Sequence, residues 1–218
     1  MVVGRLADEQ WRLTKLALAA LADDEFALAG SGAIREHGLI NRPTQDVDLF
    51  TVQSAQARFE PAVDRLITQV REHGYRVLVE RRQQGFAQLT VTTPNGLEIG
   101  MDLGIDWRAE PAVSLAIGPV LAQDDAVGNK IAALFSRGEV RDFLDVDAIR
   151  RSGQYSDADL YRLAKRADTG FTLDRLAQRL AFAERMQPEH VTDYGVIPAQ
   201  LDEIKSRLAR WRDAIVAH

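Results

Sequence analysis

Apolar residues recur along the chain at two different periods, which predict two kinds of structure. In residues 8–21 they return every three or four positions, the spacing of one buried helix face. Residues 46–51 instead alternate polar and apolar side chains, as a half-buried strand does. After about residue 112 the helical period continues almost to the end. We therefore expect an α/β (α+β) fold, with a mixed sheet flanked by helices in domain 1–115 and a helical C-terminal domain at 116–218.

Glycine, proline and small polar residues mark the ends of the expected elements. The expected strands are residues 26–29, 46–51, 75–80, 86–92 and 97–103, and the expected helices are residues 8–21, 33–37, 58–73, 156–167, 172–186 and 198–216. Gly38 and Gly74 suit helix C-termini, and Ser156 and Thr172 suit N-caps. Pro198 suits the first turn of the last helix.

The composition is that of an ordinary soluble globular protein, with 46% hydrophobic and 27% charged residues. The chain has no cysteine, which excludes disulfides, thiolate catalysis and cysteine-based metal sites. No cationic segment followed by an apolar core opens the sequence, and the longest apolar runs are too short to span a bilayer. We therefore expect a cytoplasmic protein without a membrane partner.

Charge is distributed unevenly along the chain. The net charge of −5 is not the electrostatic footprint of a nucleic-acid-binding protein taken as a whole. The acidic excess falls in residues 1–145, whereas residues 146–218 carry slightly more basic than acidic side chains. A local basic face on the last third of the chain therefore remains open.

Gly30, Ser31 and Gly32 stand between an expected strand and an expected helix. Glycines allow a sharp backbone turn and leave amide N–H groups open, and the start of the following helix favours negative charge. Such a turn can seat a phosphate group. On its own, such a turn is more often a plain tight connection between two elements.

Asp46 and Asp48 lie two residues apart in a strand pattern, so their carboxylates face the same side. A divalent cation such as Mg²⁺ or Mn²⁺ would remove their mutual repulsion and prefers oxygen ligands. The alternative is a solvent-facing edge strand that carries two aspartates. Asp102 on a later strand is the expected third carboxylate, with Glu98 as the alternative and Asp106 as a weaker candidate.

A phosphate-binding turn followed by paired carboxylates suits nucleotidyl transfer, which needs charge neutralisation on a nucleoside triphosphate and an activated hydroxyl. The segment LAGSGAIREHG at 28–38, followed by RPTQDVDLF at 42–50, resembles the nucleotidyltransferase superfamily. It is most similar to the AbiEii-type toxin branch, which includes the MenT toxins of mycobacteria. The segment KIAALFSRGEVRDFLD at 130–145 resembles the lysine and the RDxxD element of that branch.

The resemblance implies a nucleotidyltransferase-type fold and an enzyme that uses Mg²⁺ or Mn²⁺. It would transfer a nucleoside monophosphate from a nucleoside triphosphate, with CTP or UTP favoured, to the 3′ end of tRNA. The added nucleotide would block aminoacylation and growth, and a cognate antitoxin would neutralise the toxin. The resemblance also implies that Lys130 and Arg42 bind phosphate and that Asp145 is needed for activity, and we expect a monomer.

Lys130, Leu134, Arg137 and Arg141 step by four, three and four residues, which would place them on one helical face toward the triphosphate. The alternative is a surface helix with internal ion pairs. Thr44 lies in the loop before the paired aspartates. We hypothesise that its phosphorylation would silence the enzyme by adding negative charge beside the metal site; a turn-capping threonine is the alternative.

Two other functions fit parts of this pattern. Small-molecule nucleotidyltransferases, such as those that modify aminoglycosides, use the same glycine turn and paired aspartates, and a net charge of −5 suits a cationic acceptor. A non-catalytic binding module could also retain the fold. The element from Lys130 to Asp145 favours the toxin branch.

Overall fold

The computed structural model describes residues 2–44 and 46–217. The chain divides into two compact units that are not continuous in sequence. The first unit contains the residues up to Glu36 and Pro43–Ala122, and the second contains His37–Arg42 and the chain from Gln123 onward. The domain boundary expected at residues 115 and 116 falls within the first unit.

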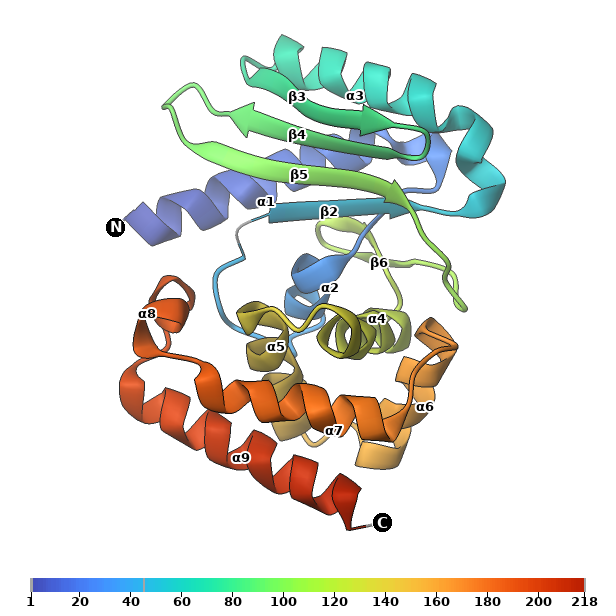
Figure 1. The fold of residues 1–218 in the computed structure, drawn as a ribbon. Coiled ribbons are helices and arrows are strands. Elements are labelled where there is room, and N and C mark those ends of the chain that lie inside the picture. The colour runs from blue at the N-terminus through green and yellow to red at the C-terminus, as the bar shows by residue number, and fades with distance from the viewer. Residues whose placement is uncertain (1, 45, 218) are drawn as a thin grey trace. The chain divides into compact units, whose positions relative to one another are not determined.

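The first unit is built on a mixed seven-stranded sheet in the order β3-β4-β5-β2-β1-β7-β6 (Figure 1). The strands are β1 Ala27–Leu28, β2 Asp46–Thr51, β3 Arg76–Gln83, β4 Phe86–Thr92, β5 Glu98–Ile105, β6 Val113–Leu115 and β7 Gly118–Val120. β2 and β5 run parallel, as do β1 and β7, and the other neighbours run antiparallel. This agrees with the mixed sheet expected from the sequence.

Three helices accompany this sheet: α1 Val2–Ala20, α2 Gly30–Glu36 and α3 Phe59–Glu72, with 3₁₀ turns at Ala22–Asp24 and Gln53–Arg58. α1 and α3 pack against each other and against strands of the sheet (Figure 1). The alternating apolar positions of the central strands form the core beneath them, with members Val47, Leu49, Ala87, Leu89, Val91, Ile99, Met101 and Leu103. One face of each central strand is therefore buried, and the polar positions face the other side.

The second unit is helical. Its helices are α4 Gln123–Ser136, α5 Val140–Arg151, α6 Asp157–Ala167, α7 Leu173–Ala181, α8 Pro188–Val191 and α9 Pro198–Val216, with 3₁₀ turns at Phe182–Arg185 and Thr192–Tyr194. The expected N-cap is confirmed at Ser156, whose hydroxyl accepts a hydrogen bond from the Asp159 N–H at 3.1 Å. Trp211 of α9 is fully buried, and its indole N–H donates to the Tyr161 hydroxyl at 2.7 Å.

The expectation of helix directly after residue 112 is wrong, because β6 and β7 form a hairpin there. Gly118 adopts a φ of 131°, which no helix contains, and Pro119 cannot donate a helical hydrogen bond. Val120 instead aligns with Leu28 of β1. Long-range pairing with β1 thus decides a segment whose local period alone is ambiguous.

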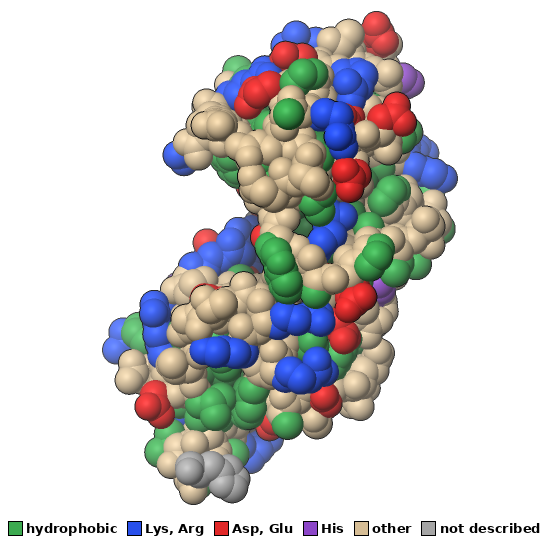
Figure 2. Space-filling model, turned by 90° about the vertical axis from the view of Figure 1, so that its right-hand side faces the viewer, with side chains coloured by type: hydrophobic (Ala, Val, Ile, Leu, Met, Phe, Trp, Pro, Cys, Tyr) green, Lys and Arg blue, Asp and Glu red, His purple; other side chains and the backbone are tan. Residues whose placement is uncertain are grey.

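None of the described helices is long and apolar enough to cross a membrane. On the face shown in Figure 2, basic and acidic side chains are interspersed. This distribution agrees with the small net charge of −5. Any attraction for a charged ligand must therefore come from local groups.

Candidate active site

Asp46 and Asp48 lie on one face of β2, as the alternation of the sequence predicts. Val47 and Leu49 are buried, with exposed fractions of 1% and 0%, whereas both aspartates are half-buried. Residues at i and i+2 of a strand share a face. The two carboxylates therefore lie on the side opposite the apolar core.

Asp102 is the third carboxylate that the strand register brings to this face. In the parallel pair of β2 and β5, Asp48 is the partner of Asp102 and Asp46 is the partner of Gly100. Glu98 precedes Gly100 on β5 and lies beyond the first residue of β2. The register therefore brings Asp102, rather than Glu98, beside the paired aspartates.

Two glycines allow the paired carboxylates to lie close to backbone. A Cβ atom on Gly30 would overlap the Asp48 carboxylate, and Gly30 has a φ of 55°, which disfavours other residues. A Cβ atom on Gly100 would lie 2.5 Å from Asp46 Oδ1. A side chain at either position would therefore displace a candidate metal ligand, and at Gly30 it would also strain the backbone.

The glycine turn is itself part of a helix. Gly30, Ser31 and Gly32 form the first turn of α2, not a separate turn before a helix at 33–37. Gly32 is packed so closely that a Cβ atom there would lie 2.9 Å from Leu28 Cδ1. The predicted C-terminal glycine is confirmed at Gly38, where φ is 75°.

The two carboxylates of the pair lie against different neighbours. Asp46 lies against Gly100 of β5, whereas Asp48 lies against Gly30 at the start of α2. Across residues 2–44 and 46–217, no three His, Asp or Glu side chains are arranged to hold one metal ion. Even so, Asp46, Asp48 and Asp102 supply oxygen donors from neighbouring positions of one sheet face, which is the chemistry that Mg²⁺ prefers. The residues present therefore fit a divalent cation by donor type.

A buried hydrogen-bond network holds the chain at the start of β2. The Gln10 side chain of α1 donates from Nε2 to the Asp46 carbonyl at 3.0 Å and accepts from the Thr44 hydroxyl at 2.9 Å. Arg35 of α2 donates to the same hydroxyl at 3.0 Å. Gln10 and Thr44 are only 2% and 4% exposed. Sequence reasoning missed Gln10 and Arg35, because nothing local links them to residue 46.

In the second unit the structure brings together three predicted site residues: Arg42, Lys130 and Asp145. The Arg42 guanidinium donates to both carboxylate oxygens of Asp145, at 2.6 and 2.7 Å. Lys130 Nζ lies 3.0 Å from Asp145 Oδ2. Asp145 is fully buried and Lys130 nearly so, and a charge at such a depth must be paired. The two cations predicted to bind phosphate are thus also the partners of Asp145.

Asp142 completes this buried network. Its carboxylate accepts from Arg137 at 2.9 and 3.1 Å and from the Glu139 backbone N–H at 3.2 Å, and Lys130 Nζ lies 3.5 Å away. The carboxylate therefore caps the N-terminus of α5 and also neutralises Lys130. The first aspartate of the RDxxD element, Asp142, is therefore a helix cap.

The expectation that Lys130, Arg137 and Arg141 share one helical face is wrong. Lys130 lies on α4, which ends at Ser136, and Arg141 lies on α5. Gly138 separates the two helices with a φ of 63°. Arg141 lies instead 2.8 Å from Glu139 at the start of its own helix.

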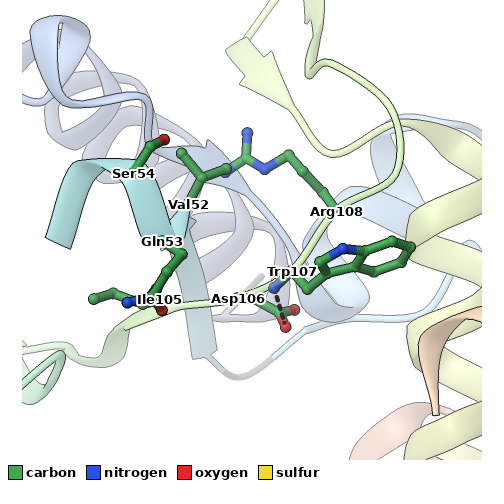
Figure 3. Close-up of a pocket in the computed structure, with 7 residues that line it drawn as sticks. All are labelled: Val52, Gln53, Ser54, Ile105, Asp106, Trp107 and Arg108. Atoms are coloured by element: carbon green, nitrogen blue, oxygen red, sulfur yellow. Dashed lines mark hydrogen bonds between the residues drawn. The ribbon is translucent and has the colours of Figure 1, made fainter. Parts of the chain in front are cut away.

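Asp106, the weaker sequence candidate, lies apart from the paired carboxylates along β5. It lines a cavity of about 490 Å³ just beyond the ends of β2 and β5, together with Val52, Gln53, Ser54, Ile105, Trp107 and Arg108 (Figure 3). Its carboxylate accepts a hydrogen bond from the Trp107 backbone N–H at 2.8 Å. Asp102, rather than Asp106, is therefore the partner of Asp48.

Comparison with known proteins identifies the family. The family model described as nucleotidyl transferase AbiEii toxin, type IV toxin–antitoxin system, matches residues 13–215. The chain belongs to this family. The resemblance seen in the sequence is thereby confirmed, and the protein is a nucleotidyltransferase of a toxin–antitoxin family.

Solved structures share the fold of this AbiEii family member. MenT4, a nucleotidyltransferase toxin from Mycobacterium tuberculosis, is similar with a TM-score of 0.60 and 17% identity, over 99% of this chain and 84% of that chain. JHP933 from Helicobacter pylori is similar with a TM-score of 0.55 and 21% identity, over 96% and 91% of the two chains. No curated protein matches.

Proposed function

We propose that this AbiEii family member transfers a nucleoside monophosphate from a nucleoside triphosphate to a hydroxyl group, with a divalent cation held by Asp46, Asp48 and Asp102. The attacking hydroxyl oxygen forms a bond to the α-phosphorus, the bond from that phosphorus to the bridging oxygen breaks, and pyrophosphate leaves. The observation that carries this proposal is the register of β2 and β5, which pairs Asp48 with Asp102.

A bound Mg²⁺ or Mn²⁺ would neutralise phosphate charge and lower the pKa of the attacking hydroxyl. Asp46, Asp48 and Asp102 would orient the ion from one sheet face. Gly30, Ser31 and Gly32 at the start of α2 would donate N–H groups to the triphosphate, because the N-terminus of a helix favours negative charge.

The proposed cations for phosphate are Lys130, Arg42 and Arg141. Lys130 and Arg42 are ion-paired with Asp145, so Asp145 would act by fixing the direction of both side chains. This gives a physical reason for the proposed need for Asp145: without it, two buried cations would lose the group that orients them.

For the acceptor we propose the 3′ end of tRNA, with CTP or UTP as donor. Membership of a toxin–antitoxin family supports this, because a blocked 3′ end cannot be aminoacylated and growth would stop. The proposed setting is the cytoplasm, with the enzyme as a monomer that a cognate antitoxin neutralises.

The test is transfer of label from each of the four nucleoside triphosphates to total tRNA or to an aminoglycoside, with Mg²⁺ or Mn²⁺ added. Mass analysis of tRNA 3′ ends after induced expression of the wild type and of Asp46→Ala complements it. Label in tRNA, absent with Asp46→Ala, is the expected result. Label in the aminoglycoside alone would establish the antibiotic-modifying alternative, which the net charge of −5 favours. An unchanged growth defect in Asp46→Ala would indicate a non-catalytic binding module.

Phosphorylation of Thr44 remains our proposal for regulation. Its hydroxyl is buried, donates to Gln10 and accepts from Arg35, so a phosphate there would remove the hydrogen bond to Gln10 and add charge beside Asp46. Thr44→Glu should therefore abolish transfer, and normal activity in that variant would count against the idea.

A further inference from the structure

The sheet face that carries the candidate metal ligands continues outward over β4 and β3. One row of cross-strand partners runs from Asp48 through Asp102 and Gln88 to Arg81. Neighbouring strands lie about 4.8 Å apart, so the Arg81 backbone lies on the order of 10 Å from that of Asp102. We call this side of β3 and β4 the open face, and it comprises Arg76, Leu78, Glu80, Arg81, Gln83, Phe86, Gln88, Thr90 and Thr92.

The open face is available to a ligand. Gln88, Arg76 and Arg81 are exposed, and Leu78 is 59% exposed. The opposite side of β4 is part of the buried core, with Ala87, Leu89 and Val91. The exposed row therefore leads from the candidate reacting centre to the edge of the sheet.

Arg81 and its neighbour Arg82 show that the two sides differ in charge pairing. Arg82 lies on the core side, where it donates to Glu60 at 2.7 Å and Asp64 at 2.6 Å on α3. Its hydrogen bond holds the pKa of Asp64 below the usual value. Arg81 donates to the Gln83 side chain at 2.9 Å, and among the residues that the structure describes no carboxylate lies within ion-pair distance of it.

The partners of Arg81 are of the kind that recognises nucleic acid. Its guanidinium lies over the Phe86 ring, 5.9 Å from the centroid. Glu80, the nearest carboxylate in sequence, accepts a hydrogen bond from Thr90 at 2.8 Å instead. A cation beside an aromatic ring suits a phosphate next to an unstacked base. Arg76, on the same face, adds a second positive charge.

We propose that the open face binds the single-stranded end of a nucleic-acid acceptor, with Arg81 on a backbone phosphate and Phe86 against a base. This inference rests on the proposed function and names the acceptor's binding surface. Because Arg81 lies in the same row as Asp48 and Asp102, it would meet a backbone phosphate close to the attacking hydroxyl. The same arginines repel a polycationic antibiotic. An acidic protein would also be attracted to these arginines. However, Arg81 lies in the same row of cross-strand partners as Asp48 and Asp102, which favours a nucleic-acid acceptor over an acidic protein.

The test measures binding of a short, fluorescently labelled single-stranded RNA with a free 3′ hydroxyl to the full chain, over a range of salt concentrations. Arg81→Gln should weaken binding about tenfold and reduce the slope of log affinity against log salt by about 1. Phe86→Leu should weaken binding about tenfold without changing that slope. The matched control is Arg151→Gln, because Arg151 is an exposed arginine of α5 in the second unit.

Unchanged RNA affinity in Arg81→Gln, or an equal loss in Arg151→Gln, would overturn the inference. A wild-type protein that binds no RNA would also overturn it. So would a result in which Arg81 contributes to the binding of an acidic protein but not to the binding of RNA. If Arg81→Gln leaves nucleotide transfer to RNA unchanged, the open face is not the binding surface of the acceptor, while the proposed function stands. Transfer that survives Asp48→Asn would instead overturn the proposed function.

Discussion

Two clusters of aspartates in this chain have similar spacing but opposite surroundings. Asp46 and Asp48 are half-buried on a strand and lie against glycines. Asp142 and Asp145 are fully buried, and arginine and lysine side chains surround them. Because a buried charge is tolerated only when it is paired, the second cluster is bound up with the integrity of its unit. The first cluster is only half-buried, so solvent reaches it. Residue type alone therefore does not reveal which acid does chemistry.

The largest effect should come from Asp48→Asn, which removes one donor of the proposed metal site. We expect nucleotide transfer to fall by about three orders of magnitude, since a bound metal contributes several kcal/mol to such a reaction. The measurement is incorporation of labelled nucleotide. Asp106→Asn, beside the cavity beyond β5, is the control and should retain activity. Activity within tenfold of wild type in Asp48→Asn would remove the distinction between the two clusters.

Asp145→Asn should have the larger effect on stability. It leaves Arg42 and Lys130 buried without their carboxylate, which costs about 3–5 kcal/mol of the free energy of unfolding. Thermal unfolding should therefore begin about 10 °C lower. Asp48→Asn in the same assay should cost less than about 1 kcal/mol, because it relieves repulsion among neighbouring acids. Equal losses in the two variants would contradict the comparison.

Gly30→Ala tests the close contact between backbone and carboxylate. The added Cβ must displace Asp48, and misplacement of a reacting group by about 1 Å can cost a hundredfold in rate. Gly96→Ala is the matched control, because Gly96 also has a positive φ but a Cβ added there would meet nothing within 4 Å. Gly96→Ala should lose only the stability that its positive φ costs and keep its activity, whereas Gly30→Ala should lose about a hundredfold in transfer. Similar activities would argue against a role for this contact.

The smallest effect is expected from Thr44→Val, which keeps the shape of the side chain and removes its hydroxyl. Gln10 and Arg35 would each lose a buried partner, at a cost of about 1–3 kcal/mol. The start of β2 should loosen, so more Mn²⁺ should be needed for half-maximal transfer. Thr44→Ser keeps the hydroxyl and should restore the wild-type requirement. A Thr44→Val protein with unchanged stability and metal requirement would show that the network does not position Asp46.

The sequence predicts local features of this molecule well. The alternation around Asp46 and Asp48 gives the bounds of β2, and Pro198 marks the start of the last helix where the structure has it. Each of these depends on signals within a few residues. The family resemblance, carried by motifs of the same short range, is confirmed.

Features that depend on distant partners could not be predicted in this way. The choice between Asp102 and Glu98 needs the register of β2 and β5, which no local pattern encodes. The hairpin of β6 and β7 forms because β7 pairs with β1. The break at Gly138, by contrast, left a local signal, because a glycine within a helical period is a reason to expect an end.

The parallel pairing of β2 with β5 has a consequence for the moment at which the enzyme can become active. Because α3, β3 and β4 lie between them in the sequence, Asp48 and Asp102 can meet only after these elements have been synthesised. During translation the N-terminal residues leave the ribosome first, so a nascent chain that ends before β5 carries the paired aspartates without their partner strand. If Asp102 holds the metal as proposed, we expect no nucleotide transfer from unfinished chains, and truncated products of the gene should be harmless.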